Sequence, residues 1–423
     1  MARYNKEQLI EFEQRLIDRY NNNQLPFLFH LCGGNEDQLI EIFDEVQDGD
    51  WVLATHRNHY QAYLHGIEPE VVEDRVMNGR SMFIYDKEKK FFSSAIVGGI
   101  PGIAVGLAMA LKRKGSNNRV WCFVGDGAED TGHFAESVRY VDGWDLPCEF
   151  VVEDNDMSII AKKKHRWGTD EVPPWPDCVR RYNYKLPYPH ARTKDFCDLS
   201  ETNKIKKTDE EYFPRLPEVE LANFPDYLQD ITSSWPPVGL DYKGAITQAM
   251  TDLGENKSTI FLGYNLGGDF GNAMGTLSGV DESQKIETPV VENLMGSMAL
   301  GMSLEGFKAV VYYERQDFML VAADAIGNHI SQLERISHGE FKPNVILRTV
   351  VADSGPFYSG PTHSQDLTEV FRKLVEFPIL EPSTPTEALE DYKRAELHDG
   401  PIMIVERKSC YDGKTPTTTK SIQ

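Results

Sequence analysis

Short apolar runs alternate with amphipathic stretches over much of the chain. The runs Val120–Val124 and Glu149–Val152 are rich in β-branched and aromatic residues, as is typical of parallel strands that are covered on both faces. Between them, His133–Tyr140 carries apolar residues at helical spacing. Strands that alternate with helices in this way predict a mostly parallel sheet flanked by helices.

The same rhythm returns in the second half of the chain. There we expect, in chain order, helix Gly244–Leu253, strand Thr259–Leu262, a glycine-spaced helix within Thr288–Leu304, strand Ala309–Tyr313, helix Phe318–Ile336, strand Asn344–Val351, helix Leu367–Leu374 and strand Ile402–Val405. At the start of the chain, an amphipathic helix is expected at Asn5–Tyr20. We therefore predict the α/β class, with one mostly parallel, helix-flanked sheet in residues 1–160 and another in residues 239–423.

Residues 161–238 interrupt this pattern. They contain ten of the 23 prolines of the chain, together with aromatic–proline clusters such as YNYKLPYPH. We interpret them as an extended connector that wraps around the domains, with disorder as the alternative. The aromatic residues favour a packed connector, because disordered segments are poor in them.

The composition argues against nucleic acids and anionic membranes as partners and indicates a cytosolic protein. The net charge is −22, which argues against nucleic acids and anionic membranes as partners, because phosphate groups are bound by basic surfaces. Six scattered cysteines without metal-site spacing suit a reducing cytosol. No run approaches 18 apolar residues, and residues 1–24 read as a charged amphipathic helix and not as a signal peptide. We expect a cytoplasmic enzyme.

The chemistry is concentrated where two predicted strands end. Gly125-Asp126-Gly127 directly follows the first strand, and Asn155 follows the second. The carboxyl ends of parallel strands form the edge at which open α/β sheets bind ligands. A carboxylate, an amide oxygen and a nearby backbone carbonyl are ligands that Mg²⁺ prefers, usually together with a phosphate group. The pattern predicts a Mg²⁺-dependent diphosphate site.

Two further stretches carry unusual residues. The stretch THRNHYQAYLHG contains His56, His59 and His65, whose spacing matches no standard zinc site, so polar loop histidines are the plain interpretation. The run Gly98–Gly102 opens a predicted helix. Clustered glycines weaken a helix unless the backbone geometry requires them, so this run indicates a close backbone approach.

The order GDG, 27 residues, Asn resembles the thiamine diphosphate motif of the superfamily that contains transketolases and 2-oxo-acid dehydrogenases. The resemblance implies thiamine diphosphate and Mg²⁺ as cofactors. Asp126, Asn155 and the carbonyl of Met157 would be the metal ligands, and Gly125 and Gly127 would flank the diphosphate.

Residues 26–160 as a whole resemble the diphosphate-binding domain of the dehydrogenase alpha subunits. That family has a tyrosine-arginine-x-histidine-glycine motif, so Arg57 is expected to grip the diphosphate and His59 to face the reacting carbon. His56 stands in place of the family tyrosine. Backbone groups at Gly99 and Ile100 would meet the aminopyrimidine ring.

Residues 240–410 resemble the pyrimidine-binding domain of the dehydrogenase beta subunits. The resemblance implies that Glu292 is the catalytic glutamate and Phe318 the ring-stacking aromatic residue, and that His363, in GPTHSQD, is a third catalytic residue. Judged alone, Glu292 is a helix-start carboxylate as in many proteins. Transketolases carry an aspartate where Ser359 stands, and beta subunits an acid where Asn265 stands.

Three functions are consistent with these residues. The first is the decarboxylating component of a 2-oxo-acid dehydrogenase, which passes an acyl unit to an acceptor protein. The second is a transketolase-like ketol or acyloin transferase that acts on ketose substrates. The third is an inactive interaction protein that keeps the fold. We expect the first, in a homodimer or higher homo-oligomer that lacks the C-terminal third domain of the related enzymes.

Overall fold

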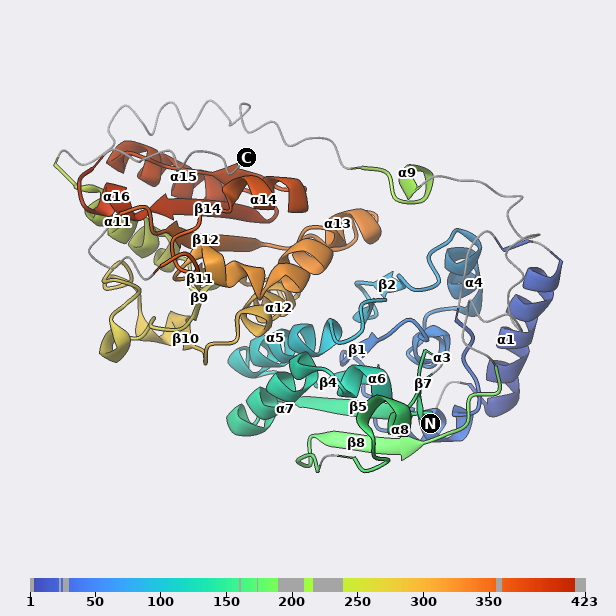
Figure 1. Ribbon diagram of the computed structural model, residues 1–423. Helices are drawn as coiled ribbons and strands as arrows, with labels where there is room; N and C mark the ends of the chain where they lie inside the picture. Colours follow the sequence, from blue (N-terminus) through green and yellow to red (C-terminus); the bar gives the residue numbers. More distant parts are fainter. Residues whose placement is uncertain are drawn as a thin grey trace. The chain divides into compact units, whose positions relative to one another are not determined.

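The computed structural model describes residues 4–22, 24–25, 30–159, 161–172, 174–188, 209–215, 239–354 and 360–414. Each half of the chain is built around its own six-stranded sheet (Figure 1). The first unit comprises Met1–Leu216 with Glu334–Phe341, and the second comprises Pro217–Leu333 with Lys342–Gln423. The prediction of two helix-flanked sheets of the α/β class is confirmed.

The first sheet has the strand order β2-β3-β1-β4-β5-β8, and every neighbouring pair is parallel except β2 with β3. Its strands are β1 (Trp51–Ala54), β2 (Tyr85–Asp86), β3 (Phe91–Ser93), β4 (Val120–Gly125), β5 (Cys148–Asp154) and β8 (Val179–Asn183). A separate two-stranded ribbon consists of β6 (Met157–Ser158) and β7 (Ala161–Lys162). The predicted strands at residues 120 and 149 are therefore the two central neighbours β4 and β5, both buried.

Helices cover this sheet and fix the ends of its strands. They are α1 (Lys6–Asn21), α2 (Glu36–Phe43), α3 (His59–Leu64), α4 (Pro69–Met77), α5 (Ile100–Arg113), α6 (Asp126–Glu129), α7 (Gly132–Trp144), α8 (Lys163–Trp167) and α9 (Asp209–Tyr212). Helix α5 packs against β4, β5 and α7 and is buried from Ile100 to Leu111, which explains its alanine-rich and glycine-rich sequence. Thr131 caps α7 by accepting a hydrogen bond from the Phe134 backbone N–H.

The second sheet is entirely parallel, with the order β10-β9-β11-β12-β14-β13. Its strands are β9 (Thr259–Gly263), β10 (Lys285–Glu287), β11 (Lys308–Tyr313), β12 (Val345–Val351), β13 (Ile379–Leu380) and β14 (Ile402–Arg407). The strands predicted from apolar runs lie at its centre. They are buried on both faces, as parallel strands between helices are.

The helices of the second half include one departure from the prediction. They are α11 (Tyr242–Glu255), η2 (Gly268–Phe270), η3 (Glu282–Gln284), α12 (Glu292–Leu304), η4 (Gln316–Leu320), η5 (Asp324–Ile330), α13 (Leu333–Ile336), α14 (Thr368–Leu374), α15 (Pro385–Leu397) and α16 (Lys408–Tyr411). The single helix expected at Phe318–Ile336 is instead a 3₁₀ turn, a π-helical stretch and a short α-helix. The side chain of Asn293 accepts the hydrogen bond of the Ala325 backbone N–H at 3.2 Å, which interrupts a regular α-helical ladder.

Part of the expected connector belongs to the first sheet. Strand β8, at Val179–Asn183, pairs in parallel with β5 and extends the sheet beyond residue 160. Its sequence, VRRYN, has few apolar residues because β8 is an edge strand, which is why the apolar pattern did not reveal it. Most of the remaining connector, residues 189–208 and 216–238, lies outside the described residues.

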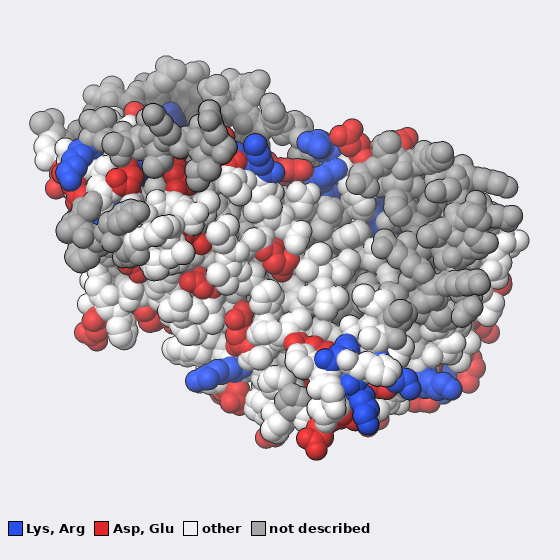
Figure 2. Space-filling model, viewed as in Figure 1, with Lys and Arg blue, Asp and Glu red and all other residues white. Residues whose placement is uncertain are grey.

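The surface is acidic in keeping with the composition. Asp and Glu side chains are spread over the face shown in Figure 2. Among the helices that the structure describes, none is both long enough and apolar enough to cross a membrane.

Candidate active site

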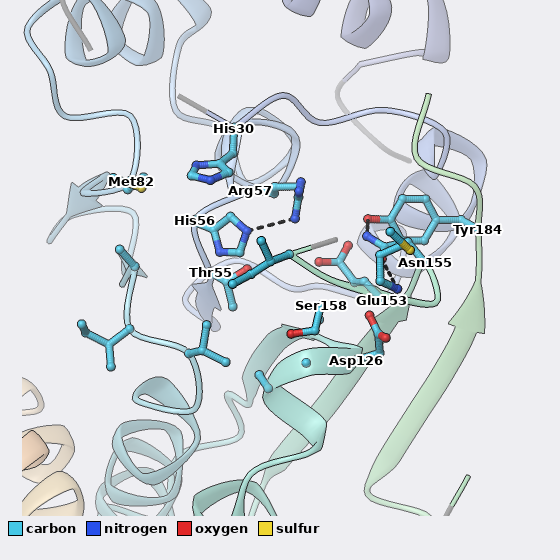
Figure 3. Close-up of a pocket in the computed structure, with 18 residues that line it drawn as sticks. His30, Thr55, His56, Arg57, Met82, Asp126, Glu153, Asn155, Ser158 and Tyr184 are labelled. Carbon is cyan, nitrogen blue, oxygen red and sulfur yellow. Dashed lines mark hydrogen bonds between the residues drawn. The ribbon is translucent and has the colours of Figure 1, made fainter. Parts of the chain in front are cut away.

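A pocket in the first unit lies beyond the carboxyl ends of β1, β4 and β5 (Figure 3). Residues from several loops line it: His30, Thr55, His56, Arg57, Met82, Ala95, Ile96, Val97, Gly125, Asp126, Gly127, Ala128, Glu153, Asn155, Met157, Ser158, Ile159 and Tyr184. The strand ends predicted to bind a ligand therefore line one pocket. Gly125, Asp126, Gly127, Asn155, Met157 and Arg57, all predicted at the diphosphate site, lie in this one pocket.

Asp126 is the acidic group at the end of β4. It is the first residue of α6, and only 1% of its surface is exposed. Its Oδ2 accepts a hydrogen bond from Nη2 of Arg166 at 2.9 Å. Burial raises the pKa of the Asp126 carboxyl, while Arg166 opposes that rise. A buried carboxylate of this kind is stabilised by cations.

Gly127 lies in close contact with Ser158. A Cβ atom there would lie 2.7 Å from Oγ of Ser158, closer than van der Waals contact allows. The glycine lets the loop after β5 pack directly over the first turn of α6.

Asn155 ends the turn that follows β5. Its Oδ1 accepts a hydrogen bond from the Met157 backbone N–H at 2.9 Å, and its Nδ2 donates to the hydroxyl of Tyr184 at 3.2 Å. These bonds fix the Asn155 side chain in the pocket wall. Together with Asp126 and Met157, it gives the pocket a carboxylate, an amide oxygen and a backbone carbonyl, a ligand chemistry that fits Mg²⁺.

Two histidines and an arginine face the pocket from the opposite wall. Nη1 of Arg57 donates to Nε2 of His56 at 2.9 Å, and the rings of His56 and His30 meet edge to face with centroids 4.5 Å apart. Figure 3 shows the three side chains grouped on this wall. His30 and His56 were not predicted as site residues. His30 lies two residues before Cys32 in the segment Cys32-Gly33-Gly34, and those glycines were the available signal for it.

His59, predicted as the active-site histidine, lies apart from the other predicted residues. It is completely buried, and it is not one of the described residues that line the pocket. Its Nδ1 lies 2.9 Å from Oε1 of Glu13 and its Nε2 lies 2.9 Å from Oγ of Ser81. The first turn of α3 therefore places the His59 ring in the core, and its expected role at the reacting carbon stays a prediction.

Gly99 and Ile100 are also not among the described residues that line the pocket. They form the start of α5, and the lining is supplied by Ala95, Ile96 and Val97, a few residues earlier. The glycine run has a local reason at Gly98, which has a φ of +79°, and whose Cβ would lie 2.8 Å from Oγ1 of Thr131.

Glu153 is a buried acid of the pocket that sequence reasoning missed. Its carboxylate accepts hydrogen bonds from Nδ2 of Asn35 at 3.0 Å, from Nε2 of Gln61 at 3.0 Å, and from the hydroxyl of Tyr182 at 2.7 Å. Burial raises the pKa of Glu153 to about 7, and the hydrogen bonds and the charge of Arg57 limit that rise. The acid stands directly before Asp154-Asn155, where the sequence offered only an unremarked glutamate in an apolar strand.

The second unit presents the other predicted catalytic residues. Glu292 begins α12 and is 7% exposed; the Tyr264 hydroxyl donates to its Oε1 at 3.4 Å. The Tyr313 hydroxyl donates to the Glu292 backbone carbonyl at 3.2 Å. At this helix start, Tyr264 thus contacts the Glu292 carboxylate and Tyr313 contacts the Glu292 backbone.

Phe318 and His363 come from different elements and meet in the second unit. Their rings are perpendicular, with centroids 5.2 Å apart. Phe318 lies in η4, which packs against α12, the helix that Glu292 begins. Asn265 has a φ of +60° and donates to Oε2 of Glu314 at 3.3 Å, so an acid lies beside it in space although the two residues are 49 positions apart in the chain. Ser359 lies outside the described residues.

Comparisons with known proteins match both halves of the chain. A family model described as the Dehydrogenase E1 component matches residues 4–171, and one described as the Transketolase, pyrimidine binding domain matches residues 238–414. The alpha subunit of acetoin:2,6-dichlorophenolindophenol oxidoreductase from Cupriavidus necator is 25% identical over 290 residues, which cover 66% of this chain and 80% of that protein.

Other matches are shorter or more distant. The pyruvate dehydrogenase E1 component subunit alpha of Rickettsia felis is 31% identical over 161 residues, 36% of this chain and about half (49%) of that protein. Among solved structures, a transketolase from Campylobacter jejuni has a TM-score of 0.61 at 14% identity, covering 94% of this chain and 77% of that one. At this identity the likeness concerns the fold alone.

Proposed function

We propose a function from one premise: the chain belongs to the superfamily of thiamine diphosphate-dependent enzymes that contains transketolases and the E1 components of 2-oxo-acid dehydrogenases. Within it, the protein acts as a decarboxylating component. It cleaves the carbon–carbon bond beside the carbonyl of a 2-oxo acid and transfers the acyl unit to an acceptor, such as a partner protein. The matches to alpha subunits of acetoin and pyruvate enzymes support this choice over a ketol transferase.

The observation that carries the proposal is the shared pocket of Arg57, Asp126, Asn155 and Met157. Asp126, Asn155 and the Met157 carbonyl would hold Mg²⁺, and the guanidinium of Arg57 would bind the diphosphate oxygens. The loops after β1, β4 and β5 bring these groups together.

The remaining residues would act on the organic part of the cofactor and on the substrate. Thiamine diphosphate supplies, when bound, a thiazolium carbon that attacks a carbonyl group. Glu292, which is buried beside Tyr264, would share a proton with the pyrimidine nitrogen. His56 and His30, in the pocket wall, and His363, beside Phe318, are the side chains available to move protons at the substrate oxygen.

We also propose that the active species is a homodimer or a larger homo-oligomer. The expected diphosphate ligands belong to the first unit and Glu292 to the second. As the family resemblance implies, one cofactor would take these two sets of residues from two copies of the chain. A cytoplasmic location remains part of this proposal.

A substrate assay tests the proposal. The purified protein is incubated with thiamine diphosphate, Mg²⁺ and dichlorophenolindophenol, and with single 2-oxo acids or ketose phosphates. We expect CO₂ release from one or more 2-oxo acids, and none from the Asp126→Ala variant. Consumption of ketose phosphates without CO₂ release would instead favour the transferase, and no reaction with any substrate would contradict both.

A further inference from the structure

Arg166 makes an unusual set of contacts beside the pocket. Its Nη2 donates to Oδ2 of Asp126 at 2.9 Å, its Nε donates to Oδ2 of Asp130 at 2.9 Å, and its Nη1 donates to the Ala161 carbonyl at 2.8 Å. All three guanidinium nitrogens are engaged, and the side chain is only 13% exposed. The guanidinium therefore links both ends of the short helix α6 to the chain segment that follows β6.

The cations around Arg166 do not share its contact with Asp126. Nζ of Lys163 pairs with Asp154 at 2.9 Å, and Arg181 pairs with Glu129 and Asp154. Within the described residues, Arg166 is the cationic side chain bonded to the Asp126 carboxylate. A variant at Arg166 thus removes this cationic contact of Asp126, together with the bonds to Asp130 and the Ala161 carbonyl.

The geometry leaves one carboxylate oxygen of Asp126 for another ligand. The bond with Arg166 uses Oδ2, and no hydrogen bond within the described ranges uses Oδ1, while Asp126 lines the pocket. A carboxylate that is held through one oxygen keeps a single rotamer and presents the other oxygen in a fixed direction. Carboxylates that bind metal ions are commonly held in this way by a neighbouring donor.

We propose that Arg166 is a positioning residue, which holds Asp126 through Oδ2 so that Oδ1 faces the divalent cation of the pocket. The proposal rests on the proposed function, because it takes Asp126 as a cation ligand. An opposite effect is conceivable on the same contacts: a guanidinium that competes with the cation for Asp126 would weaken cation binding. The two roles predict changes of opposite sign when Arg166 is replaced.

Binding of Mn²⁺ distinguishes the positioning role of Arg166 from the competing role without any measurement of catalysis. Free Mn²⁺ is counted by its paramagnetic resonance signal while the protein is titrated in the presence of thiamine diphosphate. We expect Arg166→Gln to weaken Mn²⁺ binding about 10- to 100-fold relative to wild type. Arg166→Lys, which keeps the charge but not the three-nitrogen contact, should lie between the two.

Arg180→Gln is the matched control. Arg180 also pairs with two carboxylates, Glu45 and Glu149, but it is not among the described residues of the pocket lining. Its variant should bind Mn²⁺ as the wild type does. Circular dichroism checks that each variant is folded; if Arg166→Gln is not, the weaker binding expected of Arg166→Lys decides.

The outcomes separate this inference from the proposed function. Unchanged binding in Arg166→Gln, with normal binding in the wild type, would overturn the positioning role alone. Tighter binding would overturn it in favour of competition. Absence of Mn²⁺ binding to the wild type in the presence of thiamine diphosphate would contradict the proposed function and the positioning role with it.

Discussion

Nδ1 of His59 lies 2.9 Å from Oε1 of Glu13, and both side chains are completely buried. The contact joins helix α1 to the first turn of α3, directly behind the loop that carries His56 and Arg57 into the pocket. The backbone N–H of Cys32 donates to the same Glu13 oxygen at 3.2 Å. Glu13 and His59 therefore support the pocket wall from the core and do not take part in it.

The first prediction is that His59→Gln acts on stability. The variant disturbs the bonds to Glu13 and Ser81 and leaves a buried carboxylate poorly paired, so the free energy of unfolding should fall by about 1–3 kcal/mol. Urea unfolding followed by circular dichroism measures this. The turnover number of folded protein should change little.

His56→Gln is the control for that prediction. It should lower turnover and leave the free energy of unfolding nearly unchanged. Its side chain lines the pocket, so turnover should fall, by about 10²-fold if it moves a proton in the reaction, with little change in unfolding. Loss of turnover in a stable His59→Gln protein would restore His59 as the catalytic histidine.

The comparison of His59 with His56 shows what the sequence could and could not predict about the site. The family motif pointed to the segment that contains His56 and Arg57, and both residues line the pocket, although the strand before them was not predicted. Which of two histidines three residues apart faces the pocket depends on where α3 begins, and element boundaries are the least certain part of such reasoning. Glu153 escaped notice for a related reason: its partners Asn35, Gln61 and Tyr182 are far from it in sequence.

The fold was predictable where burial on both faces leaves a continuous apolar run. Strands β4, β5, β11 and β12 are of this kind. Strand β8 is not, because an edge strand needs few apolar residues, and the broken helix around Ala325 depends on a side-chain contact from Asn293 that no local pattern encodes. Helix α15 begins at Pro385 behind a capping box formed by Thr384 and Glu387, a start signal that was present but not used.

The second prediction concerns the pH dependence of stability through Glu153. Its carboxyl has an ordinary pKa of 4.5 and a pKa of about 7 in the folded protein, where burial favours the protonated form. Between pH 4.5 and pH 7, Glu153 is more often protonated in the folded protein than in the unfolded protein. The contribution of Glu153 to the free energy of unfolding is therefore largest below about pH 4.5 and falls as the pH rises to about 7. The loss amounts to about 3 kcal/mol.

Glu153→Gln removes this titration. The difference in unfolding free energy between the variant and the wild type should therefore shift in favour of the variant as the pH rises from about 4.5 to 7, and then level off. Urea unfolding at a series of pH values measures the difference, in which the other titrating groups largely cancel. A difference that does not vary with pH would show that the pKa of Glu153 is the same in the folded and the unfolded protein.

The third prediction concerns assembly. Asp126→Ala and Glu292→Ala should each be inactive, because one lacks a proposed metal ligand and the other the proposed catalytic acid. If one cofactor takes these residues from two chains, a mixture whose subunits have exchanged should regain part of the wild-type activity. Mixing after mild dissociation, followed by the substrate assay, tests this, and each variant mixed with itself is the control. A fully active monomer by chromatography would refute the proposed assembly.

The fourth prediction tests the central claim, that Glu292 activates thiamine diphosphate in this protein. Glu292→Gln keeps the shape of the side chain and removes the acid, so cofactor binding should change little, because the proposed diphosphate and metal ligands lie in the first unit. The measurement is the exchange of the thiazolium proton with solvent deuterium in cofactor-loaded protein, followed by NMR, with Glu255→Gln on α11 as a surface control. The account predicts that exchange slows by about 10²- to 10⁴-fold in Glu292→Gln and not in the control. Unchanged exchange in folded, cofactor-loaded Glu292→Gln protein would contradict it and leave Glu292 as a helix-start carboxylate.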